Sequence, residues 1–422
     1  MFKRILMFNR WMSFLIVVFI VSFVMSATGY GAVFNVTNPT EFQDALNIAA
    51  SNSENDTINV SSGTYNITTT LTYNAAQNYT LTITGAGAGS TILDGGSSVQ
   101  ILNIDTTGLA SDDLADISIS GISFRNADTQ SNGGGLYINT NNAEITVQDS
   151  EFSSNTTTLY GNGGGAYVLS TYGTVTLTNN TFSGNTAFGN GGAFARSDHG
   201  TVTLTNNTFS GNYALYTSGG VSAQSNSGTV TLTNNTFSGN RADYYGSGGG
   251  VSAQSNSCRL TLTNNTFKDN YVYGLGGGGA FVNSAYGTIT LTNNTFSGNR
   301  ADFYNNPYGY AYGGGAYVFL STMGAADIYN NIFYDNFTNT VGNSGEDLYV
   351  KNTGDLNDTV STRVYLFNND LGPNADLVTA MSEDLVVTDI DNYSQGNNIQ
   401  ADCLLTADFH LQAGSPCIDA GD

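Results

Sequence analysis

The sequence predicts an all-β protein, a right-handed parallel β-helix with a capping helix at its N-terminal end. Three observations lead to this prediction: a repeat of 27 to 30 residues, alternating apolar and polar residues within each repeat, and a composition of 51 glycines with only 10% charged residues. A chain of 422 residues would be large for one globular domain, but a repeat array grows along one axis without that limit.

The repeat is clearest in residues 173–185, which recur as 200–212 and 228–240 with looser copies on both sides. Within it Val175 and Leu177 alternate with threonines, a pattern typical of a half-buried strand. A second short strand carries a repeated Phe, and a third follows a glycine run. One unit cannot bury its apolar face alone. We therefore expect the units to stack in parallel, with three strands per coil and about ten to twelve coils.

An asparagine recurs at the bend between the first two strands of each unit. In a stack of coils, each of these side-chain amides can bond to the next, and Asn tolerates the left-handed backbone of tight bends. We expect these residues to be structural. They are Asn180, Asn207, Asn235, Asn265, Asn294 and Asn331.

The chain divides into four segments. Residues 1–31 read as a signal peptide, because Lys3, Arg4 and Arg10 precede an apolar run, Met12–Met25, that is shorter than the ~20 residues of a membrane span. An uncleaved membrane anchor is the alternative. Residues 32–114 hold the N-terminal cap and first coils, and residues 115–340 hold the regular repeat. Residues 341–422 are expected to form irregular final coils, in a sequence that reads as a fragment truncated before an anchoring region.

The capping helix is predicted at residues 40–50. Thr40 and Gln43 have the spacing of a capping box. The helix carries one apolar stripe that would cover the first coil, where strand edges would otherwise be unpaired. This stripe consists of Phe42, Ala45, Leu46 and Ala49.

Composition excludes several classes of function. The net charge is −22 and the few Lys and Arg residues are spread singly, so we expect no nucleic-acid partner. The cysteines Cys258, Cys403 and Cys417 make no disulfide framework, and pairing of the last two stays open. With His199 and His410 as the sole histidines, the sequence shows no metal site and no cofactor site.

Two recurring motifs carry a family resemblance. Phe-x-x-Asn, as in Phe182 to Asn185, is paired with Gly-Gly-Ala-aromatic, as in Gly191 to Phe194. This pairing resembles the repeat of chlamydial-type polymorphic outer membrane proteins, and the flanking segments are similar to the wider pectate-lyase-like β-helix superfamily. The resemblance implies an extracellular or cell-surface adhesin, with the outer membrane as one location. We expect membrane association only through a region that this sequence does not contain.

The loops between Phe-x-x-Asn and the glycine run vary in length and are rich in tyrosine. Stacking would bring them onto one side as an aromatic strip, suited to a glycan or protein ligand. The alternative is that the rings pack on one another and only cover the coils. The predicted binding residues are Tyr160, Tyr213, Tyr216, Tyr244, Tyr245, Tyr271, Tyr273, Tyr304, Tyr308 and Tyr310.

A polysaccharide lyase or glycoside hydrolase is the alternative function, because the superfamily contains such enzymes. That chemistry needs carboxylates that converge with each other or with a basic residue. Asp149 and Glu151 are the nearest acidic pair, but nothing in the sequence brings them to a base, and Asp198-His199 reads as an exposed loop dipeptide. We therefore assign no catalytic residue and favour a protein that is not an enzyme.

A third function is suggested by the threonine columns. Thr201, Thr203 and Thr205 would stack on equivalent threonines of neighbouring coils into a flat grid, which resembles the surface of β-helical ice-binding proteins. Threonine is also the common outward residue of a strand, and we favour this ordinary structural role over ice binding.

Overall fold

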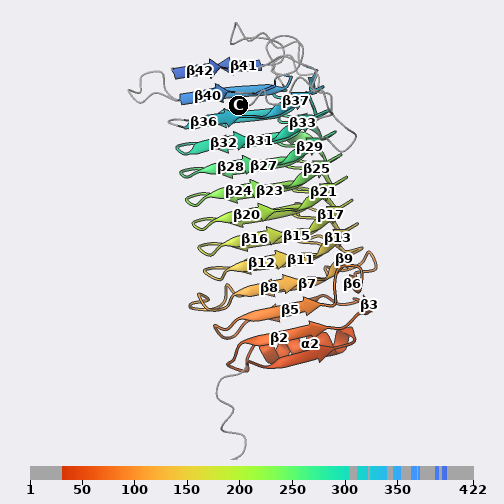
Figure 1. Cartoon of the computed structure of the whole chain (residues 1–422). Helices are drawn as coiled ribbons and strands as arrows, with labels where there is room; N and C mark the ends of the chain where they lie inside the picture. The colour runs from red at the N-terminus through yellow and green to blue at the C-terminus, as the bar shows by residue number, and fades with distance from the viewer. Residues whose placement is uncertain are drawn as a thin grey trace, which may run out of the picture.

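The computed structural model describes residues 31–303, 311–321, 324–339, 346–352, 363–367, 369–370, 385–388 and 392–396. Within them the chain winds into a column of stacked coils, from the helix α2 (Pro39–Ala49) at one end to β42 (Asn392–Gly396) at the other (Figure 1). Each strand pairs in parallel with its copy one coil later. The predicted parallel β-helix is confirmed. Residues 1–30 of the predicted signal peptide and most of residues 341–422 lie outside the described residues.

Sheet A contains the strands with alternating Val or Leu and Thr. Val202 and Leu204 are fully buried, whereas Thr203 and Thr205 lie half-buried on the outer face, as predicted. The strands are β1 (Val33–Val36), β2 (Asp56–Val60), β5 (Leu81–Gly85), β8 (Ile117–Ser120), β12 (Ile145–Gln148), β16 (Val175–Thr178), β20 (Val202–Thr205), β24 (Val230–Thr233), β28 (Leu260–Thr263), β32 (Thr288–Thr292), β36 (Ala325–Tyr329), β40 (Arg363–Phe367) and β42.

Sheet B carries the repeated Phe, which stacks in the core. Phe209 lies between Phe182 and Phe237 with ring centroids 4.8 and 5.1 Å apart and rings within 6° of parallel. The strands are β3 (Gly63–Asn66), β6 (Thr91–Asp94), β9 (Ser123–Arg125), β13 (Glu151–Ser153), β17 (Thr181–Ser183), β21 (Thr208–Ser210), β25 (Thr236–Ser238), β29 (Thr266–Lys268), β33 (Thr295–Ser297) and β37 (Ile332–Tyr334).

Sheet C follows the glycine runs, and its 11 strands agree with the predicted ten to twelve coils. Its outward residues differ from coil to coil, unlike those of sheet A. The strands are β4 (Leu71–Asn74), β7 (Leu102–Asp105), β11 (Leu136–Thr140), β15 (Ala166–Ser170), β19 (Ala193–Ser197), β23 (Val221–Ser225), β27 (Val251–Ser255), β31 (Ala280–Ser284), β35 (Ala316–Leu320), β39 (Leu348–Asn352) and β41 (Leu385–Thr388).

A fourth sheet, sheet D, corrects the prediction of three strands per coil. It lies between sheets B and C, and its second residue, such as Ala214 or Ala242, is buried. Five of its eight strands have two residues, which is too short to show alternation in sequence. The strands of sheet D are β10 (Asp128–Thr129), β14 (Thr156–Thr157), β18 (Thr186–Ala187), β22 (Tyr213–Ala214), β26 (Arg241–Gly246), β30 (Tyr271–Gly274), β34 (Arg300–Asp302) and β38 (Phe337–Thr338).

The predicted asparagine stack is confirmed at the bend between sheets A and B. Asn207 Nδ2 donates to Asn235 Oδ1 at 3.0 Å, and Asn180 Nδ2 donates to Asn207 Oδ1 at 3.1 Å. A second stack, which the sequence analysis did not assign, lies at the bend between sheets B and D. There the Asn of Phe-x-x-Asn repeats the pattern, and Asn212 Nδ2 donates to Asn240 Oδ1 at 2.9 Å.

The helix α2 covers the open end of the column. The predicted stripe is confirmed, because Phe42, Ala45, Leu46 and Ala49 are buried. The predicted capping box at Thr40 and Gln43 is wrong. Asn38 is the N-cap and accepts from the backbone N–H of Glu41 at 3.0 Å, because Pro39 begins the helix one residue earlier. Gln43 instead bonds both backbone groups of Thr72 in β4, at 2.8 and 2.9 Å, and so pairs the exposed edge of sheet C.

Candidate functional site

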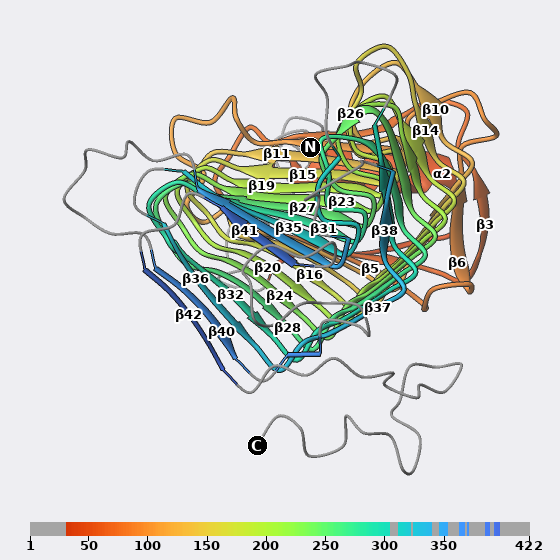
Figure 2. The same cartoon turned by 90° about the horizontal axis from the view of Figure 1, so that it is seen from above.

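The loops between sheets D and C project from one corner of the coil section (Figure 2). Four predicted binding residues are exposed there: Tyr160 by 76%, Tyr216 by 38%, Tyr244 by 56% and Tyr245 by 69%. With Phe188 they form an aromatic ridge, in which ring centroids lie 4.6 Å apart from Tyr160 to Phe188, 4.5 Å from Phe188 to Tyr216 and 6.2 Å from Tyr216 to Tyr244. The rings of Tyr160, Phe188, Tyr216 and Tyr244 contact one another, and the four tyrosines remain exposed. Their role in binding stays a prediction.

Three other predicted residues are not exposed in this way. Tyr213 and Tyr271 are half-buried in sheet D, and each donates its hydroxyl to a carboxylate, Asp243 and Asp302 respectively, at 3.1 Å. Burial, followed by the charge of Asp302, raises the pKa of Tyr271 to about 12, so this phenol stays protonated at neutral pH. Tyr273 is half-buried as well. The predicted residues Tyr304, Tyr308 and Tyr310 lie outside the described residues.

The backbone of the ridge is strained at two places. Leu159 and Tyr160 have φ values of 42° and 73°, and Tyr244 and Tyr245 have 43° and 72°. This left-handed region is unfavourable for bulky residues, and such strain persists where the surroundings or a function maintain it. Both pairs point large side chains into solvent.

A cavity of about 450 Å³ lies at the foot of this ridge. Its walls come from three successive coils, which end in β7, β11 and β15. Amides, one carboxylate, hydroxyls and two tyrosines line it, without any basic side chain. The lining residues are Gln100, Asn103, Asp105, Gln130, Ser131, Asn132, Tyr137, Leu159, Tyr160 and Gly161. Only Tyr160 among them was predicted from sequence.

Hydrogen bonds fix part of the cavity wall. Asn103 Nδ2 donates to Gln100 Oε1 at 3.0 Å, and Gln100 Nε2 donates to the carbonyls of Asn132 and Gly133 at 2.7 and 3.0 Å. Asp105 Oδ1 accepts from the N–H and hydroxyl of Thr107 at 2.8 and 2.6 Å. The polar groups are therefore held in place before any ligand arrives, which lowers the entropic cost of binding.

Tyr137 forms one side of the cavity and ends a row of rings on the outer face of sheet C. We call this row, Tyr137, Tyr167 and Phe194, the outer ring ladder. Its ring centroids lie 5.2 and 4.9 Å apart, with interplanar angles of 9° and 16°. Burial and then the negative charge of Asp105 raise the pKa of Tyr137, so this phenol stays protonated at neutral pH.

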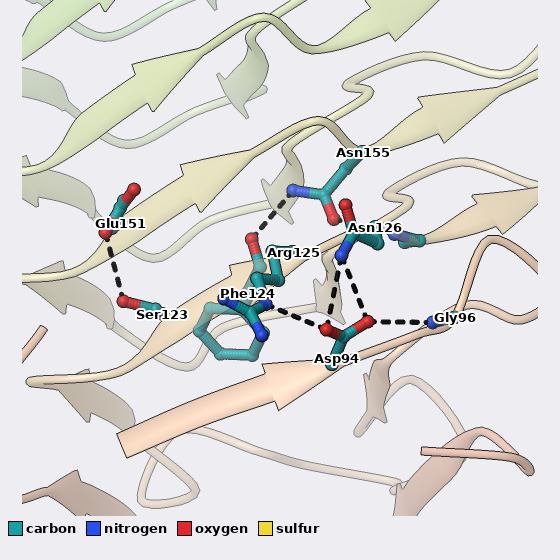
Figure 3. Close-up of polar contacts among 9 residues, drawn as sticks. Asp94, Gly96, Ser123, Phe124, Arg125, Asn126, Glu151 and Asn155 are labelled. Atoms are coloured by element: carbon teal, nitrogen blue, oxygen red, sulfur yellow. Dashed lines mark hydrogen bonds and ion pairs between the residues drawn. The ribbon is translucent and has the colours of Figure 1, made fainter. Parts of the chain in front are cut away.

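The acidic residues weighed for catalysis do not converge. Glu151 accepts from the hydroxyl of Ser123 at 3.1 Å, and Asp149 accepts from Asn179 at 3.0 Å. On sheet B, Asp94 is surrounded by donors, with Arg125 Nε at 2.8 Å (Figure 3).

Burial alone would raise the pKa of Asp94, but hydrogen bonds from Gly96, Asn126 and Arg125 outweigh it and lower that pKa. This carboxylate is a fully engaged structural anion.

The dipeptide Asp198-His199 lies at the turn after β19. Asp198 accepts from Arg196 Nε at 2.7 Å, and the exposed His199 ring stacks on Tyr172 at 4.7 Å. The described residues hold no group of three or more His, Cys, Asp or Glu side chains placed to bind a metal ion. In this same part of the chain, no helix has the length and hydropathy of a membrane span.

The cavity was missed from sequence for a physical reason. Tyr137, Tyr167 and Phe194 each stand two residues after the last glycine of their run, so their common column was readable. No glycine run stands directly before β7, because Gly95 and Gly96 lie further upstream, so the sequence alone did not align Asn103 with these three aromatic residues. Only the strand register pairs Asn103 with Tyr137.

Residues 156–333 match a family model described as the right handed beta helix region. The fold is that of the right-handed parallel β-helices. The match and the coil topology support the pectate-lyase-like superfamily, while the resemblance to polymorphic outer membrane proteins stays a prediction. No curated protein matches the chain.

Several solved structures are similar in fold. The PL6 family polysaccharide lyase Pedsa3628 from Pseudopedobacter saltans is 11% identical, with 89% of this chain and 94% of that chain covered and a TM-score of 0.36. A mannuronic acid specific family 6 lyase from human gut microbiota is 10% identical, with 82% of each chain covered and a TM-score of 0.36. The A-module of the mannuronan C-5 epimerase AlgE4 from Azotobacter vinelandii is 11% identical, with 86% and 100% covered and a TM-score of 0.38.

The polysaccharide lyase and epimerase activities in these names are properties of those proteins. At this level of similarity the likeness extends to the fold alone.

Proposed function

We propose that the chain is a secreted or cell-surface β-helix that binds a neutral polysaccharide, and that it serves as an adhesin. The observation that carries this proposal is the cavity beside Tyr137, which combines an aromatic ring with fixed amide and carboxylate groups and has no basic side chain in its lining. The aromatic ridge, which begins at Tyr160 on the cavity rim, extends the same surface over three further coils.

The chemistry of the cavity fits sugars. A pyranose has apolar C–H faces that stack on aromatic rings, and hydroxyls that both donate and accept hydrogen bonds. Asn103 supplies its Oδ1 and its second N–H, and Asp105 accepts from hydroxyls, while both N–H groups of Gln100 already donate to backbone carbonyls. The Asp105 carboxylate would repel an anionic sugar. A neutral polymer is therefore favoured over a uronate polymer.

The proposal is tested by binding and cleavage assays on one panel. The purified chain is incubated with neutral polysaccharides (β-glucan, glucomannan and galactan) and with acidic ones (polygalacturonate and alginate). Affinity electrophoresis reports binding, and released reducing ends report cleavage. We expect retardation by at least one neutral polymer, lost in Tyr137→Ala and kept in the control Tyr286→Ala, which removes an exposed tyrosine outside the cavity. No retardation by any polymer would refute the proposal.

The second candidate is a polysaccharide lyase or glycoside hydrolase. It is favoured by Arg196 of β19, on the same sheet as Tyr167, and by Asp198 at the turn after β19, which form one charged pair near the outer ring ladder. Sustained release of reducing ends that is abolished in Arg196→Ala would establish this enzymatic activity and refute a purely adhesive function.

A further inference from the structure

We infer that the cavity receives one pyranose ring laid flat against Tyr137, as the next ring of the outer ring ladder. This inference rests on the proposed function and specifies its ligand: a neutral sugar with an unbroken apolar face, such as a β-glucosyl or β-galactosyl residue.

The strand register of the outer ring ladder indicates which ring face a sugar can reach. Tyr167 has a ring on each side, so both of its faces are occupied. At the Phe194 end the next residue in register is Ser222, which is fully buried by the chain itself. At the Tyr137 end the next residue in register is Asn103, and the cavity lies there. Among the described residues, no aromatic ring stacks on the face of Tyr137 that lies toward Asn103.

The surroundings of that face match the rim of a pyranose. A ring stacked on Tyr137 presents its hydroxyls sideways, toward the side chains that line the cavity. Asn103 and Gln100 are already bonded to each other, and Asp105 is held through Oδ1 by Thr107, which leaves its Oδ2 to accept from a hydroxyl. Tyr160, 76% exposed, stands at the same cavity and can flank the sugar.

Charge selects among sugars. The lining carries one carboxylate and no Lys, Arg or His, so a uronate or a sulfated sugar would place like charges together at short range. A sugar with axial hydroxyls on the stacking face would lose contact with the ring. These two conditions together define the ligand class.

The decisive variant is Asn103→Tyr, which supplies the next ring of the ladder from the protein itself. The new ring would lie in register with Tyr137 and fill the cavity. We expect the affinity for the neutral polysaccharide to fall by at least about tenfold, with a thermal midpoint no lower than that of the wild type. The matched control is Asn283→Tyr on the outer face of β31, outside the cavity, which should bind as the wild type does.

A second measurement tests the stacking inference without relying on the folding of Asn103→Tyr. Saturation-transfer NMR with methyl β-D-glucopyranoside and methyl β-D-galactopyranoside should mark the axial C–H protons of one sugar face in the wild type and in Tyr137→Phe. The saturation-transfer signals of these protons should be absent with Tyr137→Ser.

The outcomes separate the two proposals. If the polysaccharide binds but Asn103→Tyr and Tyr137→Ser bind it equally well, the stacking inference is overturned while the proposed function stands. If no polysaccharide and no glycoside binds the wild type, the proposed function itself fails.

Discussion

The asparagine stack at the bend between sheets A and B permits a quantitative test. Asn207 is 1% exposed. Its Nδ2 donates to the carbonyl of Leu177 at 2.8 Å and to Asn235 Oδ1 at 3.0 Å, and its Oδ1 accepts from the N–H and the Nδ2 of Asn180 at 2.9 and 3.1 Å. The substitution Asn207→Ala removes all four bonds at once.

The magnitude follows from what each partner loses. The Asn180 N–H is buried and has no other acceptor, so leaving it unpaired costs about 1–3 kcal/mol. Asn180 Nδ2 still bonds the carbonyl of Val147, and Asn235 Oδ1 still accepts from the Asn207 N–H. The three remaining bonds are therefore worth about 1 kcal/mol each. We expect the free energy of unfolding to fall by about 4–6 kcal/mol.

Urea unfolding followed by far-UV circular dichroism measures this change. The control is Asn226→Ala, which removes a half-buried amide that donates to Asp198 at 2.9 Å, and it should cost less than about 1 kcal/mol. If Asn207→Ala and Asn226→Ala have the same midpoint and slope, the amide stack does not stabilise the bend, and the structural assignment of these asparagines is refuted.

Three further changes have expected outcomes. Phe209→Ala, at a fully buried ring between two stacked neighbours, should lower the free energy of unfolding by about 3–5 kcal/mol in the same urea assay, and a loss below about 1 kcal/mol would contradict a packed ring stack. Burial alone would raise the pKa of Asp112, but hydrogen bonds from Thr106 and from two backbone N–H groups outweigh it and lower that pKa. The stabilisation by the charged Asp112 carboxylate is present above the ordinary pKa of Asp and is lost as the pH falls below about 4. The thermal midpoint of Asp112→Asn should therefore depend less on acid pH than that of the wild type. Identical pH profiles would be inconsistent with a stabilising role of the carboxylate. Tyr245→Gly should raise the free energy of unfolding by about 1 kcal/mol, because φ is 72° and the side chain is 69% exposed; a decrease would show that the ring packs in solution.

The coil interior was predictable because its rules are local and repeat. Alternation identified Val202 and Leu204 as buried, and the spacing of asparagines identified the stack that contains Asn207. The N-cap was missed because two capping signals overlap: Asn38 followed by Pro39 competes with Thr40, and only the backbone decides between them. Sheet D was missed because five of its eight strands have two residues, which cannot display a period.

The candidate site was predictable only in part. Loop composition indicated an aromatic side, and the exposure of Tyr160 and Tyr245 agrees with it. Sequence could not show that Tyr213 and Tyr271 lie half-buried against the next coil. Their hydroxyls bond to Asp243 and Asp302, and this depends on how neighbouring coils align. The cavity depended on register between coils, which no single coil encodes.

The outward residues of the three long sheets differ in how much they vary from coil to coil, and this indicates which face is suited to bind a ligand. Sheets A and B repeat the outward threonines and serines from coil to coil, as Thr203 pairs with Thr231 and Ser210 with Ser238. The outward column of sheet C changes from Asn103 through the outer ring ladder to Ser222. A face whose side chains differ from coil to coil offers a ligand distinct groups at distinct places. The cavity lies on this face, where the outward column of sheet C changes from the amide of Asn103 to the aromatic ring of Tyr137.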